Sequence, residues 1–222
     1  MMAKNLIKFD DALDLINEGD VILLRGRGFI SSIVQKAGDG KYSHVGLATW
    51  HNCAKRSSDG FPLLEITEFR EGYGGRTTNL AVSYEAHIKA ESIDVYRTSE
   101  TLTKLRFDPA TRQILPTVIP FDGKAVTNCM RRMTGLPYGW QRILEIAKRK
   151  LMFLRWYYTG YDISDDSIKS DFKNVYPVCS TAVAACFSHI GYDLVPNRSD
   201  EWTEPSDIAR SALLNYMFTL TA

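Results

Sequence analysis

The chain has 222 residues, 45% of them hydrophobic, and 27 basic against 26 acidic side chains give it a formal net charge of +1. A chain of this length can bury a substantial core, and we expect a single domain over residues 1–222. A net charge this close to zero creates no global field, so nucleic acid is not expected among the partners.

Targeting and metal-binding patterns are not found in the sequence. The first twenty residues, MMAKNLIKFDDALDLINEGD, lack the apolar core and cleavage pattern of a secretory signal, and no run of eighteen apolar residues follows. We therefore expect a cytoplasmic protein without stable membrane insertion. No CxxC pair and no zinc-like histidine spacing occurs, so neither a metal site nor a disulfide framework is expected for the cysteines at 53, 129, 179 and 186.

The first half of the chain is predicted to be mainly sheet. An amphipathic helix is expected over Phe9–Asn17, followed by a buried strand VILLRG and a short helix GFISSIVQKAG that ends at Gly38. Three further strands are expected in HVGLATW, FPLLEITEF and SIDVYR. A polar loop joins the first two of these three.

The second half is predicted to be mainly helix. Residues 98–133 begin with a polar, proline-punctuated stretch and are interpreted as an insertion or excursion, with helical periodicity returning near 121. Helices are expected at 121–133, 139–155, 178–190 and 206–216. Strands followed by helices favour an α+β fold, an antiparallel sheet packed against helices.

The stretch RILEIAKRKLMFLRWYYTGY combines basic residues with Trp and Tyr. A membrane-surface helix has this composition. An amphipathic packing helix with its basic side chains in water has it too, and the apolar period favours this second interpretation.

Cys179 is the first candidate for chemistry. Pro177 suits the start of a helix and Gly191 its end, which places Cys179 in the first helical turn. Unpaired N–H groups and the helix dipole favour a thiolate there, as in an activated nucleophile, whereas a small buried hydrophobe is the alternative. Cys186 lies two turns further along, without such help, and is expected to be structural.

His44 is the second candidate, at the start of a strand that otherwise looks buried. Strand alternation places His44, Gly46, Ala48 and Trp50 on one face. Small side chains on this face and on the Cys179 helix would let the two pack closely. We expect Cys179 and His44 to form a thiolate–imidazolium pair.

A third group normally orients the histidine of such a pair. Glu65 and Glu68 lie on opposite faces of the next strand, and the register decides which of them shares the face of His44. If the numbers of two residues that pair across these strands add up to an odd value, Glu65 shares the face of His44. If they add up to an even value, Glu68 does. We favour Glu65, because a carboxylate between Leu64 and Ile66 would be costly to bury without a function.

The other histidines have ordinary contexts. His189 lies in the last turn of its helix, His51 lies in a polar loop, and His87 lies in the charged stretch YEAHIKAE. None is expected to be catalytic, since none stands at an apolar strand end beside small residues.

These motifs together resemble a known family. EGDVILL and YSHVGLATW are similar to the second half of the NlpC-type papain-like amidase motif, whereas TGLPYGW and CSTAVAACF are similar to its first half. The reversed order resembles the circularly permuted branch, which includes YiiX-like proteins and, more distantly, lecithin retinol acyltransferase. EPSDIARS also resembles the start of the YiiX-like C-terminal helix. The resemblance covers about residues 18–97 and 134–211.

The resemblance implies a permuted papain-like fold and a set of roles. Cys179 matches the nucleophile, His44 the general base and Glu65 the polar orienter. Tyr138 matches a tyrosine near the nucleophile that assists the oxyanion or the substrate, with a packing role as its alternative, and Tyr42 joins it as a substrate contact. The chain departs from the family at one point, where CSTAVA replaces the commoner Cys-Ser-Glu-Leu-Val start.

The expected function is a cysteine peptidase or amidase that needs no metal or organic cofactor. The resemblance implies small peptides or cell-wall peptide fragments as substrates. Acyl transfer to or from lipid through the same thioester is one alternative, because the acceptor depends on the pocket. A binding protein that keeps the fold without turnover is the other.

Overall fold

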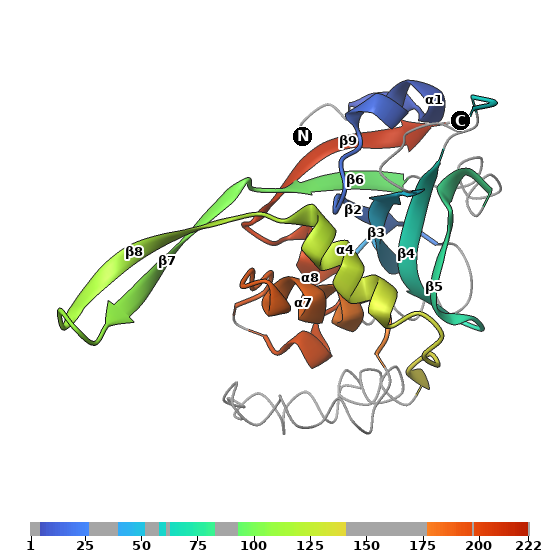
Figure 1. Ribbon diagram of the computed structural model, residues 1–222. Coiled ribbons are helices and arrows are strands. Elements are labelled where there is room, and N and C mark those ends of the chain that lie inside the picture. The colour runs from blue at the N-terminus through green and yellow to red at the C-terminus, as the bar shows by residue number, and fades with distance from the viewer. Residues whose placement is uncertain are drawn as a thin grey trace.

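A seven-stranded sheet forms the centre of the fold, in the order β1-β9-β6-β2-β3-β4-β5 (Figure 1). Neighbouring strands pair antiparallel except β1 and β9, which pair parallel. The strands are β1 Leu6–Lys8, β2 Val21–Leu24, β3 His44–Trp50, β4 Leu64–Arg70, β5 Gly74–Asn79, β6 Ile93–Thr98 and β9 Leu214–Thr221.

The structure is a computed structural model that describes residues 5–26, 40–51, 58–60, 63–82, 93–140, 177–196 and 198–221. The helix predicted at 28–38, nearly all of the one predicted at 139–155, Cys53 and His87 lie outside these residues. Within the described residues, no helix is long and apolar enough to cross a membrane.

Helices cover both faces of the sheet. On one face lie α4 Gly123–Arg132, α7 Cys179–His189 and α8 Pro205–Ala209, whose apolar side chains share a buried cluster with Val45 and Leu47 of β3. On the other face, α1 Phe9–Ala12 and the 3₁₀ turn Leu13–Leu15 pack against a second cluster. A further 3₁₀ turn spans Asp200–Trp202. Burial on both faces explains why β2 is apolar throughout, with all four residues buried.

All four predicted strands and two of the predicted helices are confirmed. Strands β2, β3, β4 and β6 lie where the apolar runs predict them, and α4 and α7 lie where the helical periodicity does. A largely antiparallel sheet with segregated helices confirms the α+β class. β5 was missed, because GGRTTN has neither apolar alternation nor a buried run.

Residues 101–120 form a β-hairpin that projects from the body (Figure 1). Its strands are β7 Thr101–Asp108 and β8 Gln113–Pro120, in a sheet of their own. Asp108 builds the turn by accepting hydrogen bonds from the Ala110 N–H at 3.0 Å and the Thr111 hydroxyl at 2.7 Å. The expected excursion is thus ordered, and its prolines and largely exposed β8 hid the strand pattern.

The first predicted helix is shorter than expected. It ends at Leu15 as a 3₁₀ turn, and Ile16 is already extended. The Asp20 carboxylate accepts the N–H of Asn17 at 2.8 Å, a group that a helix continuing to Asn17 would have bonded to Leu13. Asp20 is itself held by Arg97 at 2.7 Å.

The last predicted helix is wrong over most of its length. α8 ends at Ala209, and Leu214–Thr221 forms β9 instead. β9 fills the position between β6 and β1 and pairs with both. Tertiary pairing therefore overrides the helical period in the sequence.

The helix–sheet packing differs from the prediction. α7 packs on the face of Val45 and Leu47, while Ala48 and Trp50 lie in the opposite cluster. Gly46 does not make room for a helix. A Cβ atom there would lie 2.7 Å from the side chain of Ile66 on the neighbouring strand, so the glycine admits that side chain.

Candidate active site

Cys179 is the first residue of α7, and its side chain lies inside the protein. The residue is 4% exposed. Val178 caps the helix, and the hydroxyl of Thr181 accepts the Val178 N–H at 2.9 Å, which fixes the first turn. The Cys179 sulfur accepts hydrogen bonds from the backbone N–H groups of Val45 and Ser180. The helix start therefore surrounds the sulfur with donors.

His44 begins β3 and hydrogen-bonds the Cys179 thiol with its ring. Burial alone raises the pKa of this thiol, but the hydrogen bond and the positive charge of His44 outweigh burial and hold the pKa below its ordinary value. Two backbone N–H groups act in the same direction. The geometry thus favours a thiolate beside an imidazolium.

Glu68 also binds the His44 ring, with its Oε2 atom 2.6 Å from Nε2. Burial lowers the pKa of His44, but the negative charge of Glu68, followed by contact with Cys179, raises it to about 9. The His44 side chain is 17% exposed and that of Glu68 is fully buried. The protonated form of His44 is therefore stabilised at neutral pH.

Arginines hold Glu68 in place. Its Oε1 atom accepts hydrogen bonds from Arg76 Nε at 2.8 Å and Nη2 at 2.6 Å, and Arg70 lies 3.9 Å away. Arg76 lies directly opposite Glu68 on β5. Each oxygen of the buried carboxylate thus has a charged partner, which offsets the cost of burial.

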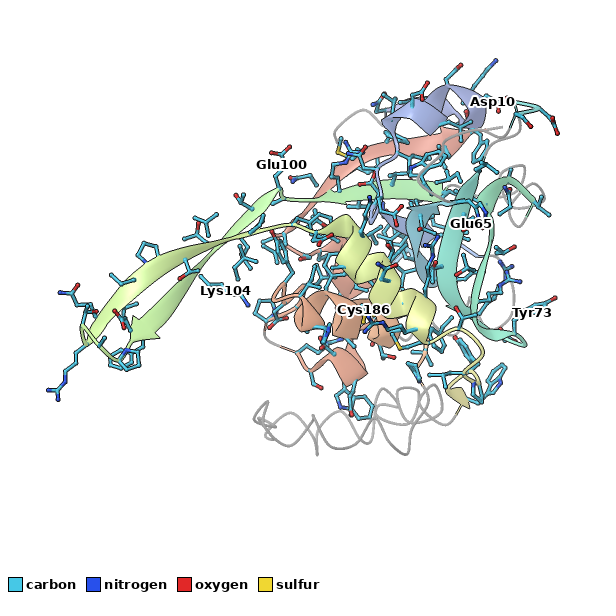
Figure 2. All side chains as sticks on the ribbon, in the orientation of Figure 1. Asp10, Glu65, Tyr73, Glu100, Lys104 and Cys186 are labelled. Atoms are coloured by element: carbon cyan, nitrogen blue, oxygen red, sulfur yellow. The ribbon has the colours of Figure 1, made fainter. Side chains whose placement is uncertain are left out.

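The favoured third residue, Glu65, is corrected to Glu68. Gly46 pairs with Glu68 across β3 and β4, so the numbers of paired residues add up to an even value. Glu68 therefore shares the strand face of His44. Glu65 lies on the opposite face, where it contacts Arg131 at 3.2 Å and His51 at 3.3 Å (Figure 2 labels Glu65). The apolar sequence neighbours of Glu65 were a wrong guide to burial, because Glu65 is partly exposed and Glu68 is the buried carboxylate.

Tyr138 reaches Cys179 from a separate segment. Its hydroxyl hydrogen-bonds Cys179, and burial, followed by the negative charges of Cys179 and Glu71, raises the pKa of the hydroxyl. The segment is bound to β5 by hydrogen bonds from Gly75 N–H to the Leu136 carbonyl at 2.9 Å and from Gly135 N–H to the Gly75 carbonyl at 2.8 Å. The structure therefore brings Tyr138 together with Cys179.

Glycines in β5 allow this close approach. A Cβ atom at Gly74 would lie 2.1 Å from the carbonyl oxygen of Leu136, and one at Gly75 would lie 2.3 Å from that of Met133. Such distances leave no space for any side chain. The two adjacent glycines in the run GGRT are thus the sequence signal for this contact. Sequence reasoning missed the signal because the run has no apolar alternation.

Tyr42 is buried in the core, and its hydroxyl already has polar partners. It is 1% exposed, and its hydroxyl donates to Asp94 at 2.5 Å and lies 2.9 Å from the hydroxyl of Tyr96. Burial and these two partners raise the pKa of the Tyr42 hydroxyl. Its expected substrate role is corrected to a structural one, because its hydroxyl is already bonded to buried Asp94.

The remaining described histidines and cysteines lie away from this constellation. His51 is exposed beside Glu65, and His189 ends α7 at the surface. Cys186 is buried in the middle of α7 and contacts Cys129 of α4. Within the described part of the chain, Cys179 and His44 are therefore the cysteine and histidine that the structure brings together.

A solved structure has a similar fold. The crystal structure of the metalloprotein yiiX from Escherichia coli O157:H7 matches this chain with a TM-score of 0.53 and 14% sequence identity, over 93% of this chain and 98% of that one. No protein-family model and no curated protein matches the sequence.

A metal centre does not fit the described side chains. The name of yiiX describes that protein as a metalloprotein, whereas no group of three or more His, Cys, Asp or Glu is placed to hold a metal ion within the described ranges. An identity of 14% establishes a shared fold alone. The chain therefore has a yiiX-like α+β fold, in which Cys179 contacts His44 and His44 contacts Glu68.

Proposed function

We propose that the protein is a cysteine hydrolase of the permuted NlpC-type papain-like group, acting on amide bonds. One observation carries the proposal: a thiol at a helix start hydrogen-bonds a histidine, which is bonded in turn to a buried carboxylate. Activated nucleophiles in this class need that arrangement of nucleophile, base and orienter. The yiiX-like fold supports the permuted order of the two motif halves.

Cys179 acts as the nucleophile. Its thiolate attacks the carbonyl carbon of the substrate, and the imidazolium of His44 donates its proton to the leaving amine. The neutral ring then takes a proton from water, which attacks the thioester and releases the acid. Glu68 keeps the ring oriented and stabilises its protonated form, without itself accepting the proton.

Tyr138 and the start of α7 stabilise the oxyanion. The backbone N–H of Cys179 lies in the first turn, where N–H groups have no partner within the helix. In the resting protein the Tyr138 hydroxyl contacts the sulfur, beside the position that the substrate carbonyl must take. Both donors are thus close to where negative charge develops.

Small peptides, including cell-wall peptide fragments, are the proposed substrates, on the strength of the motif resemblance. The test supplies a panel of such peptides and, separately, a lipid ester to the native protein, then measures the mass of the adduct on Cys179. A peptidyl adduct, with turnover lost in Cys179→Ser and His44→Gln and kept in Glu65→Gln, is the expected result.

Other outcomes of this experiment are equally specific. A fatty-acyl adduct from the lipid ester, with none from any peptide, would replace peptide hydrolysis with acyl transfer. Turnover that persists in His44→Gln would contradict the proposed base. No adduct from either substrate, together with slow iodoacetamide labelling of Cys179 at pH 6, would favour a binding protein.

A further inference from the structure

Cys129 and Cys186 face each other across the contact between α4 and α7. Cys129 lies in the middle of α4 and packs against the buried cluster to which Cys186 belongs. The thiol of Cys186 hydrogen-bonds Cys129. Figure 2 labels Cys186 on α7, where α4 passes over it. Two thiols in contact on two different helices form a pair that oxidation can join.

The two sulfurs differ in exposure and in acidity. Cys129 is partly exposed, and the hydrogen bond from Cys186 and the charge of Arg132 hold its pKa below the ordinary value despite burial. Cys186 is buried, and the hydrogen bond to Cys129, followed by burial, raises its pKa. Cys129 is thus the more accessible and more nucleophilic of the two. Cys186 is placed to attack the Cys129 sulfur once Cys129 has been oxidised.

Cys179 is too far from Cys186 to form a disulfide with it. Cys186 comes seven residues after Cys179 on α7, about two turns or roughly 10 Å along the helix axis. A disulfide requires the two Cα atoms to lie within about 7 Å. Cys186 is therefore separate from the proposed nucleophile Cys179, even though α7 carries both of these cysteines.

We propose that Cys129 and Cys186 are an oxidation site that forms a reversible disulfide with hydrogen peroxide as the oxidant. The Cys129 thiolate attacks one peroxide oxygen, so an S–O bond forms, the O–O bond breaks and the hydroxide takes up a proton as water. The Cys186 sulfur then attacks the Cys129 sulfur, and the S–O bond breaks as the Cys186 proton leaves in a second water. Two electrons pass from the thiols to peroxide.

The disulfide ties together the two helices that frame the site. α4 leads into the segment that carries Tyr138, and α7 begins at Cys179. A link between them closes a loop of more than fifty residues, which includes the whole 141–176 stretch. We therefore expect the oxidised protein to melt at a higher temperature than the reduced one.

The test uses the Cys179→Ser protein, so that the nucleophile does not consume peroxide. After brief treatment the intact protein is weighed, and a second portion is denatured, alkylated and digested so that its linked peptides can be mapped. We expect a loss of about two mass units, one peptide pair joining Cys129 to Cys186, and full reversal by dithiothreitol. Cys129→Ser, treated in parallel, should show no internal disulfide, and its melting curve before oxidation confirms that it folds.

Three results would overturn the inference. One is that Cys129 and Cys186 can both still be alkylated after the peroxide treatment. Another is oxidation of Cys129 to the sulfinic acid without a link to Cys186. The third is a disulfide that joins either residue to Cys53. Because Cys179 is absent from the test protein, none of these outcomes depends on whether the protein is a hydrolase.

Discussion

Glu68 sets the protonation state of His44, and through it that of Cys179. Its charge is the main influence that raises the pKa of His44 to about 9. Glu68→Gln removes that charge, so burial should bring the pKa of His44 down and the pKa of Cys179 back up. We expect the pH midpoint of iodoacetamide labelling at Cys179 to rise by about one to two units. Peptide mass spectrometry measures labelling site by site.

Glu65→Gln is the matched control for this experiment. It makes the same chemical change three residues away, on the strand face that carries Arg131 and His51. The labelling profile of Cys179 should stay where it is in the unmodified protein. Equal shifts in both variants would mean that Glu68 acts only through general charge or stability, and its assignment as the orienter would fail.

The proton on His44 predicts how the proposed reaction depends on pH. The pKa of His44 is raised from 6.5 to about 9, so the imidazolium persists through neutral pH and is lost as the pH rises through about 9. Release of the amine needs that proton. For any peptide that the protein hydrolyses, kcat/KM should therefore decline above about pH 9. A profile that declines already near pH 6.5 would show that His44 titrates as an unpaired histidine.

At the scale of elements, the contact between β5 and the segment at 134–140 positions Tyr138. Gly75→Ala tests it, because the new Cβ would lie 2.3 Å from the Met133 carbonyl oxygen while the backbone needs no unusual angle. We expect a loss of about 1–3 kcal/mol in the free energy of unfolding. Displacement of Tyr138 should also alter iodoacetamide labelling of Cys179. Denaturant titration and peptide mass spectrometry measure the two effects.

Gly72→Ala is the control that separates the effect of backbone strain from the effect of displacing the segment at 134–140. Gly72 has a φ of +79° and nothing within 4 Å of a built Cβ, so alanine there costs backbone strain without touching the segment. Its unfolding free energy should fall while the labelling of Cys179 stays unchanged. If Gly75→Ala also leaves the labelling unchanged, Tyr138 is held by something other than this contact.

Elements with a strong local pattern could be predicted from the sequence. HVGLATW on β3 and CSTAVAACFSH on α7 carry their own apolar signals, and the structure connects His44 to Cys179. The partner of His44 could not be predicted, because it depends on a register that no local pattern fixes. β9 was missed for a similar reason, since its strand character comes from pairing with β1 and β6.

At the scale of the whole molecule, the β7–β8 hairpin stands apart from the core. Its outer residues Phe107, Ile114 and Val118 are 58%, 65% and 60% exposed. Among the described residues its base joins the body: Leu102 and Ile119 pack against the cluster beneath α7, and the Tyr192 hydroxyl donates to the Ile119 carbonyl at 2.9 Å. The hairpin beyond this base should therefore contribute little to the stability of the body.

Removing residues 103–118 tests this division of the molecule. Leu102 and Ile119 are opposite each other in the hairpin, so an Asn-Gly turn can join them directly. We expect the shortened protein to keep its Tm within a few degrees and to label at Cys179 with the same pH profile. Both results follow if the packed base, and not the projecting strands, supports the body. A large fall in Tm with Leu102 and Ile119 retained would mean that the outer hairpin packs on the body after all, and a changed labelling profile at unchanged Tm would connect it to the site.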